Sequence, residues 1–345
     1  MINKRKLILK IRESFHWKRI NLSQHTKCQH INIAYKPPWK ILFFGTDKFS
    51  LFSLGRLLQE YRNGGAISRL EVCTSIKEMK NDVYKFAKKE NLRIWKWPPE
   101  LNRMEFDAGL VVSFGHLIPK QLIENFPLGM INVHASLLPR WRGAAPIIYS
   151  LANGDKITGV TIMQIEPARF DVGKIISQKS IKIPDNIYLP ELNVKLGSLG
   201  ANELIECLKD LPKKLNNAEH QSKEGISYAP KVETSFARID WENMTSSKIF
   251  NLERALKGFL PLTSIWKGEI IKLFGIGLLN DGCDIEMKQG FIHYDDESQK
   301  LKVVCTDKNY ITIEKVQIYQ RKLMAAKDFN NGYLKKVPLE ERYFL

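Results

Sequence analysis

Short apolar runs alternate with amphipathic segments along the first two thirds of the chain. The segment KILFFG at 40–45 is apolar after its lysine and ends at a glycine, which is typical of a buried parallel strand and a turn. Apolar residues then recur at helical spacing, after Thr46 or Asp47 as the cap. Further helices are predicted at 82–90, 120–125, 146–154 and 189–208, and strands at 70–74, 93–97, 108–114, 129–133, 158–164 and 174–183. This alternation predicts an α/β fold with a Rossmann-like, mostly parallel sheet.

The pattern changes in the last third. Residues 211–231 are polar and contain proline and glycine, which is linker composition and marks a domain boundary after a first domain at 37–210. One helix is predicted at 246–256. Short runs with period-two alternation follow at 263–266, 270–274, 291–294, 301–306 and 310–317. They predict a small C-terminal β-barrel, similar to an OB fold, at 232–345.

The first residues of the chain are strongly basic. Residues 1–40 hold ten Lys or Arg against one acid, Glu13, and so carry most of the net charge of +16. Leu7, Ile8 and Ile11 stand at roughly helical spacing among these charges. We interpret 1–36 as a disordered leader that acts as a mitochondrial transit peptide, with a basic RNA-binding tail as the alternative. No apolar run is long enough for a secretory or membrane-spanning segment, so no membrane partner is expected.

Composition and motifs exclude several classes of protein. With 345 residues, of which 44% are hydrophobic and 26% charged, the chain can form two folded domains. The five cysteines are odd in number and widely separated, which predicts reduced thiols rather than disulfides or a zinc site. FFGTDKFS at 43–50 lacks the GxGxxG spacing of dinucleotide sites, and the chain has neither a P-loop nor a GxSxG elbow.

Three polar residues form the candidate chemical site. Asn132 and His134 stand two apart at the end of a predicted buried strand, so both face one side of the sheet near the edge where α/β folds bind ligands. Asp171 lies in the turn before Gly173, between two later strands. Taken singly, these residues also fit structural roles as a loop amide, a core histidine and a turn former. Their joint position favours a catalytic site.

The motifs around these residues resemble those of the folate-dependent formyltransferases. The central ones are GMINVHASLLPRWRGAAP at 129–146 and GVTIMQIEPARFDVGKI at 159–175. The resemblance extends over FFGTDKFS, SFGHLIP at 113–119, YAPK at 228–231, ARIDW at 237–241 and AAKDFNNGYL at 325–334. It thus covers nearly all of the chain after residue 38. The late motifs make the chain most similar to the family members that act on methionyl-tRNA, in their mitochondrial form.

The resemblance implies an activity and a set of site residues. The first domain becomes the formyltransferase catalytic domain, which transfers a formyl group from 10-formyltetrahydrofolate to the α-amine of methionyl-tRNA in the mitochondrial matrix, for translation initiation. The implied catalytic residues are Asn132, His134 and Asp171. Formyl transfer develops an oxyanion and moves one proton from the amine to the folate nitrogen, so donors and an acid–base pair are needed. No metal is required. The implied folate contacts are Phe114, Ser136, Leu137, Leu138 and Pro139.

Contacts with tRNA are predicted in two places. Arg140 and Arg142 lie beside the candidate site and either meet the acceptor end or anchor their own loop. Residues 300–336 hold nine Lys or Arg against three acids, which predicts a positive face with Lys300, Lys302, Arg321 and Lys322, or else a solvated charged edge. Bacterial members carry a long basic insertion after the second strand. Here the segment at 75–81 is short and offers only Lys77 and Lys80.

Two other functions compete with this interpretation. One is a formyltransferase for a small amine, or a formyltetrahydrofolate hydrolase. The other is a non-catalytic RNA-binding protein on a formyltransferase fold. The added β domain argues against the former, and the joint presence of Asn132, His134 and Asp171 argues against the latter. A monomer is expected.

Overall fold

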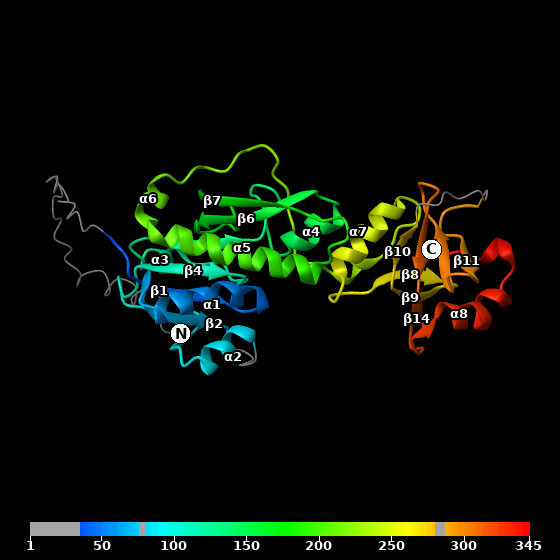
Figure 1. The fold of residues 1–345 in the computed structure, drawn as a ribbon, viewed down its shortest axis with the longest axis horizontal. Helices are drawn as coiled ribbons and strands as arrows, with labels where there is room; N and C mark the ends of the chain where they lie inside the picture. Colours follow the sequence, from blue (N-terminus) through cyan, green and yellow to red (C-terminus); the bar gives the residue numbers. More distant parts are fainter. Residues whose placement is uncertain (1–34, 76–80, 280–286) are drawn as a thin grey trace, which may run out of the picture. The chain divides into compact units, whose positions relative to one another are not determined.

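The computed structural model describes residues 35–75, 81–279 and 287–345, and Lys36–Leu345 form one compact unit (Figure 1). Residues 1–34 of the predicted leader lie outside the described residues, as do Lys77, Lys80, Cys28 and Cys283.

A seven-stranded sheet forms the centre of the first domain, in the order β3-β2-β1-β4-β5-β6-β7. Its strands are β1 Trp39–Gly45, β2 Ile67–Thr74, β3 Ile94–Lys96, β4 Ala108–Val112, β5 Met130–His134, β6 Ile157–Gln164 and β7 Ile175–Lys182. Neighbouring strands from β3 to β5 are parallel, whereas β6 is antiparallel to both β5 and β7. The α/β class and the mostly parallel sheet are therefore confirmed. All residues of β1 except Lys40 are buried, as its continuous apolar run predicts.

Six helices among the described residues accompany this sheet. They are α1 Lys48–Arg62, α2 Asp82–Lys89, α3 Lys120–Ile123, α4 Pro146–Ala152, α5 Leu189–Lys209 and α6 Leu211–Asn216. Asp47 is the cap of α1, because its carboxylate accepts a hydrogen bond from the backbone nitrogen of Ser50 at 3.0 Å. The long helix α5 packs on α1 and on β5, β6 and β7 (Figure 1). Gly197 permits this approach, since a Cβ there would lie 2.3 Å from the Phe52 ring.

The predicted linker at 211–231 differs from its expected form. It begins with α6, whose Leu211 is fully buried, and its later part pairs with the catalytic domain. Glu219 pairs with Ile175 of β7, and Tyr228 pairs with Arg142. The segment is poor in apolar residues because backbone and polar side-chain hydrogen bonds, rather than core burial, hold it in place. Composition alone therefore does not reveal that this segment is held against the catalytic domain.

The C-terminal domain consists mainly of antiparallel strands, as predicted. After η1 Thr234–Ala237 and α7 Ser246–Leu256, its described strands form two four-stranded sheets, β10-β13-β12-β11 and β15-β14-β9-β8. The strands are β8 Leu262–Trp266, β9 Glu269–Phe274, β10 Gly277–Leu279, β11 Ile292–Asp295, β12 Lys300–Val304, β13 Tyr310–Ile313, β14 Lys315–Ile318 and β15 Met324–Ala325. Helix α8 Ala326–Gly332 and the short turns η2 Leu334–Lys336 and η3 Leu339–Glu341 follow.

The single run predicted at 310–317 is two strands in the structure. The chain leaves one sheet after β13 and enters the other at β14, with Glu314 between them. A segment that passes from one sheet into the other is how orthogonal and barrel-like β domains turn their corners. The apolar alternation continues through the corner, so the pattern could not show it.

One apolar core joins residues from both domains. It includes Ile148 of α4, Leu192 of α5, Leu252 of α7 and Val303 of β12, and helices α4 and α7 pack directly together. The three described cysteines are free and buried, and burial raises the pKa of Cys207 to about 11 and that of Cys305 to about 12. Among the described helices, none combines the length and apolar character that crossing a bilayer would require.

Candidate active site

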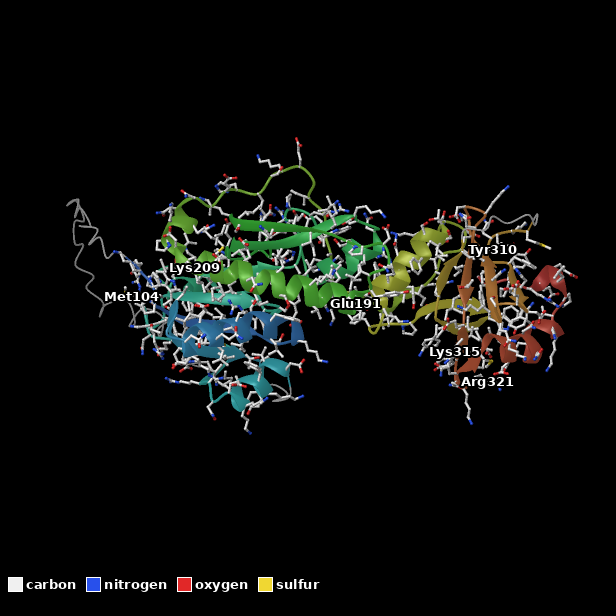
Figure 2. All side chains as sticks on the ribbon, viewed as in Figure 1. Met104, Glu191, Lys209, Tyr310, Lys315 and Arg321 are labelled. Carbon is white, nitrogen blue, oxygen red and sulfur yellow. The ribbon has the colours of Figure 1, made fainter. Side chains whose placement is uncertain are left out.

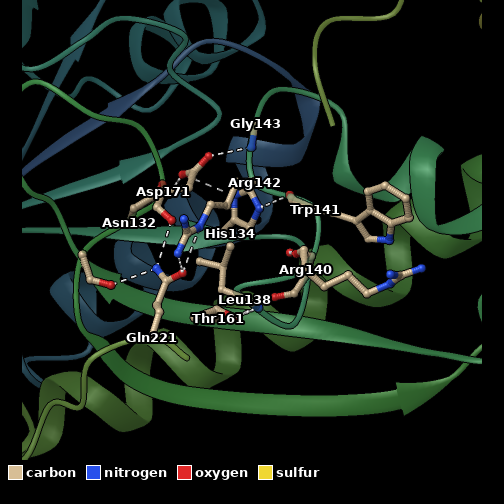
Figure 3. A network of polar contacts seen from close by, with 12 residues as sticks. Asn132, His134, Leu138, Arg140, Trp141, Arg142, Gly143, Thr161, Asp171 and Gln221 are labelled. Carbon is tan, nitrogen blue, oxygen red and sulfur yellow. Dashed lines mark hydrogen bonds and ion pairs between the residues drawn. The ribbon is translucent and has the colours of Figure 1, made fainter. Parts of the chain in front are cut away.

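The structure brings Asn132, His134 and Asp171 together (Figure 3). Asn132 and His134 stand on β5, and Asp171 lies in the turn that connects β6 to β7. Because β6 pairs antiparallel with β5, this turn returns to the β5 strand that carries Asn132 and His134. The Nδ2 of Asn132 donates to Oδ1 of Asp171 at 3.3 Å, and Nδ1 of His134 lies 3.5 Å from the same oxygen.

The Asp171 carboxylate is the centre of this network. Its second oxygen, Oδ2, accepts a hydrogen bond from the backbone nitrogen of Gly143 at 2.9 Å. Asp171 thus contacts β5 through two side chains and the loop after β5 through one amide. The side chain of Asp171 is 11% exposed, and its backbone has a φ of 55°, in the left-handed region that most residues avoid. Contacts from outside the turn must therefore hold it in place.

His134 is buried between two hydrogen-bond acceptors. Its Nε2 lies 2.9 Å from the carbonyl oxygen of Trp141, and its Nδ1 faces the Asp171 carboxylate. A neutral imidazole has one donor nitrogen only, whereas the protonated ring donates from both. Each nitrogen of the ring thus has an acceptor close by, the carbonyl of Trp141 on one side and the carboxylate of Asp171 on the other, a geometry suited to proton transfer.

The loop that contains Trp141 and Gly143 depends on a glycine. Gly143 has a φ of 123°, and a Cβ at this position would lie 2.6 Å from the carbonyl oxygen of Ala229. No other residue type fits there without moving the backbone. Gly143 thereby lets its amide reach Asp171.

The predicted folate loop lies directly after β5 and is fixed through Thr161 of β6. The Thr161 hydroxyl donates to the carbonyl oxygen of Ser136 at 2.6 Å and accepts from the backbone nitrogen of Leu138 at 3.1 Å. Gln178 of β7 donates to the carbonyl oxygen of Leu138 at 2.8 Å. Leu138 is buried, whereas Leu137 and Pro139 are half-buried. Both backbone polar groups of Leu138 are thus used within the protein, which makes this loop rigid.

Phe114 is placed differently from the expected ligand contact. It is only 4% exposed and packs in an aromatic cluster with Phe44 and Trp97, at ring-centroid distances of 5.6 and 4.9 Å. His116 stacks on Trp97 at 5.2 Å and also contacts the Phe114 ring. Phe114 follows a buried strand, so its neighbours on the sheet enclose it. Its surface for a pterin is correspondingly small, and a folate contact at Phe114 stays a prediction.

Arg140 is tied into its own loop. Its guanidinium makes a bidentate ion pair with Asp155 at 2.9 and 2.6 Å and stacks on the Trp141 ring at 4.3 Å. Burial tends to raise the pKa of Asp155, but hydrogen bonds from Arg140, Trp141 and Asn153 outweigh it and leave the pKa below its ordinary value. The same pair raises the pKa of Arg140. Of the two roles expected for Arg140, the structure supports loop anchoring.

Arg142 contacts a residue that sequence reasoning missed. Its Nε and Nη2 donate to Oε1 of Gln221 at 3.1 and 2.6 Å. Gln221 lies in the predicted linker, where composition carries no sign of a role at a site. Asp155, Thr161 and Gln178 were missed as well. Each of the four makes at least one hydrogen bond to a residue 15 or more positions away in sequence, which no local pattern reveals.

The four predicted basic residues of the C-terminal domain fall into two pairs. Lys300 and Lys302 of β12 form ion pairs with Glu314 at 2.9 Å and Asp295 at 3.4 Å. Arg321 and Lys322 are exposed in the turn between β14 and β15, and no ion pair joins them to another described residue. Arg321 lies at the margin of the C-terminal domain (Figure 2). The second pair therefore offers more uncompensated charge to a phosphate backbone.

Two family models match the chain. The model described as formyl transferase covers residues 70–208, and the model described as formyl transferase, C-terminal domain, covers residues 231–334. The human mitochondrial methionyl-tRNA formyltransferase is 40% identical to the chain, over 94% of this chain and 85% of the relative. The chain belongs to the formyl transferase family. Both of its domains match this family, and the protein is an enzyme. A methionyl-tRNA formyltransferase from the bacterium Halothermothrix orenii is 31% identical over 85% of this chain and 96% of its own.

Solved structures of formyl transferases share the fold. A sugar 3N-formyl transferase, solved with dTDP and 5-N-formyl-THF, has a TM-score of 0.58 at 20% identity and covers 82% of this chain and 98% of its own. The N-formyltransferase from Helicobacter canadensis, in complex with folinic acid and dTDP-3-aminofucose, has a TM-score of 0.60 at 20% identity, over 81% of this chain and 99% of its own. At this identity the likeness concerns the fold. Both of these proteins were solved with a folate derivative, 5-N-formyl-THF in one and folinic acid in the other.

Proposed function

We propose that this formyl transferase moves the formyl group of 10-formyltetrahydrofolate to the α-amine of methionyl-tRNA, for translation initiation in the mitochondrial matrix. The observation that carries the proposal is the joint placement of Asn132, His134 and Asp171 in one hydrogen-bonded network. The similarity to mitochondrial methionyl-tRNA formyltransferases runs through both domains and favours a charged tRNA over a small amine.

The network has groups for each part of the reaction. A C–N bond forms between the formyl carbon and the amine, and the bond from that carbon to the folate nitrogen breaks. Charge builds on the formyl oxygen in between, and Asn132 has a second amide hydrogen beyond the one given to Asp171. One proton leaves the amine and one reaches the folate nitrogen. His134 and Asp171 carry that proton, because Asp171 stabilises the charged imidazolium.

The substrates are assigned to separate surfaces. We place the folate beside the rigid loop of Ser136, Leu137, Leu138 and Pro139, where fixed backbone preserves the shape of the site. We place the tRNA phosphates on the C-terminal turn with Arg321 and Lys322, with Lys300 and Lys302 as weaker contacts because carboxylates already neutralise them. Arg142 is the better candidate of the loop arginines for the acceptor end. Its neighbour Arg140 is committed to Asp155.

The decisive experiment incubates the full chain with 10-formyltetrahydrofolate and methionyl-tRNA, and measures formylmethionine released from the tRNA. Formylmethionyl-tRNA is the expected product. Parallel reactions with free methionine and with water alone test the small-amine and hydrolase alternatives, through formylmethionine and formate respectively. Formate release at the same rate with and without charged tRNA would contradict the proposal. Binding of tRNA with no formyl transfer would favour the non-catalytic alternative.

A further inference from the structure

Gln221 makes a dense set of side-chain hydrogen bonds in the segment between the two domains. Its Nε2 donates to the carbonyl oxygens of Asp171 and Gly173, both at 2.9 Å, and its Oε1 accepts both hydrogen bonds from Arg142 (Figure 3). Both amide hydrogens and both lone pairs of the carboxamide are thereby used. The flanking His220 and Ser222 are exposed, whereas Gln221 is half-buried against the site.

These four hydrogen bonds join two segments that meet at Asp171. One is the turn between β6 and β7, which contains Asp171 and in which Ala168 also has a positive φ of 69°. The other is the loop of Trp141, Arg142 and Gly143, which supplies the amide for Asp171 and the carbonyl for His134. Positive φ at non-glycine residues is unfavourable and persists where surrounding contacts enforce it. The two hydrogen bonds from Gln221 are such contacts.

The neighbouring backbone supports the same junction. Ser227 accepts the backbone hydrogen bond of Arg142 at 2.9 Å, and its hydroxyl accepts that of Trp141, also at 2.9 Å. The segment from Glu219 to Ala229 is thus a strap across the site. Gln221 is the residue of this strap whose side chain reaches both loops.

We propose that Gln221 is a positioning residue for formyl transfer. Its carboxamide fixes the Asp171 turn against the Arg142 loop, so that the Asp171 carboxylate keeps its contacts with His134, Asn132 and Gly143. This inference rests on the proposed function, because it assigns Gln221 an effect on the same reaction. It acts through Asp171 and touches no reacting atom.

The first test compares Gln221→Leu with Gln221→Glu. The leucine variant removes all four hydrogen bonds, whereas the glutamate keeps an acceptor for Arg142 and loses both donors to the turn. If the two hydrogen bonds from Gln221 to the Asp171 turn position the carboxylate, both variants lower kcat by roughly ten- to hundredfold, because displacements of about 1 Å at catalytic groups cost that much. In Gln221→Glu, which keeps the acceptor for Arg142, the KM for each substrate is expected to change less than about threefold. Gln59→Leu is the matched control, since Gln59 also accepts a hydrogen bond from an arginine, Arg56, but on the exposed surface of α1.

The second test repeats Gln221→Glu in an Asp171→Asn background, by single-turnover measurement with excess enzyme. A residue that works through Asp171 has little further effect once that carboxylate is gone, so the two changes are expected to be strongly non-additive. The pH profile of kcat should move in Gln221→Glu and stay in place in Gln59→Leu. Thermal unfolding and circular dichroism report whether each variant is folded.

Three results would overturn the inference. One is a folded Gln221→Glu with kcat within about twofold of the wild type, well below the expected loss. Another is an equal loss of kcat in the wild-type and Asp171→Asn backgrounds. The third is a lowered melting temperature with unchanged kcat, which would mean that Gln221 only anchors the strap. Absence of formyl transfer by the wild-type chain would instead count against the proposed function itself.

Discussion

The Asp171 carboxylate contacts the side chains of Asn132 and His134 and the backbone amide of Gly143. These contacts determine the expected effect of replacing one of its oxygens. Replacement by asparagine keeps the shape but puts an amide where two oxygens now accept hydrogen bonds and face a histidine ring. We expect Asp171→Asn and His134→Ala each to lower kcat by roughly 10²–10⁴-fold, the usual contribution of a positioned acid–base group. Steady-state formylation of methionyl-tRNA measures the effect, and circular dichroism is the control for folding. A folded variant with nearly normal turnover would remove that residue from the proton path.

At the scale of the elements, the loop after β5 is held by the ion pair of Arg140 with Asp155, and this makes its stability depend on pH. The folded pKa of Asp155 is lowered, so the pair stabilises the fold fully above the ordinary value of 3.8 and loses this effect as the pH falls through the lower, folded pKa. Asp155→Asn should decrease the free energy of unfolding by about 1–3 kcal/mol at pH 7, typical for charged hydrogen bonds. The difference from the wild type should shrink below pH 3.8.

Denaturant unfolding at several pH values measures this difference. The control is Asp185→Asn, because Asp185 pairs with Lys156 at 2.6 Å on a surface where both side chains are more than three-quarters exposed. Exposed pairs contribute little to stability. An Asp155→Asn curve parallel to that of the wild type across the acid range would show that the Arg140 pair does not couple to folding.

The turn between β14 and β15 carries the second prediction at this scale. Replacement of both Arg321 and Lys322 by alanine should raise the KM for methionyl-tRNA and reduce the slope of its salt dependence by roughly one unit for each phosphate that is no longer neutralised. The matched pair Lys300→Ala and Lys302→Ala should have a smaller effect, because Glu314 and Asp295 already neutralise these lysines. The KM across a salt series measures both. Superimposable salt curves for all three proteins would exclude this face and leave Arg142 as the main candidate.

At the scale of the whole molecule, Lys36–Leu345 form one compact unit with a core shared by both domains. The site residues and the strap that connects them all lie within this unit. A chain that starts near Tyr35 is therefore expected to retain full formylation activity, as the transit-peptide interpretation of 1–36 requires. Comparison of the two proteins for KM toward tRNA and for folate binding tests it. Weaker tRNA binding with folate binding preserved would favour the RNA-binding tail.

Local patterns in the sequence sufficed for much of the fold. The apolar run predicts β1 within one residue, and the cap and helical spacing after it predict where α1 begins, because burial of a strand or a helix face needs a regular period. The same logic placed Asn132 and His134 on one side of β5. Asp171 was recognisable from its turn before Gly173, and the family motifs joined the three residues into one site.

Other features of the site and the fold depend on contacts between residues that are distant in sequence, and only the tertiary structure reveals them. Gln221 lies 50 positions from Asp171 and 79 from Arg142 in sequence. At Glu314 the chain crosses from one sheet to the other, so one regular apolar run is divided between two strands of different sheets. From the sequence, Lys300 and Lys302 are predicted to be part of a positive face, yet in the folded domain each forms an ion pair with a carboxylate. Periodicity reports how each segment is buried. It carries no information on which loops meet or which charges are paired, because strand register and the paths of the loops determine these contacts.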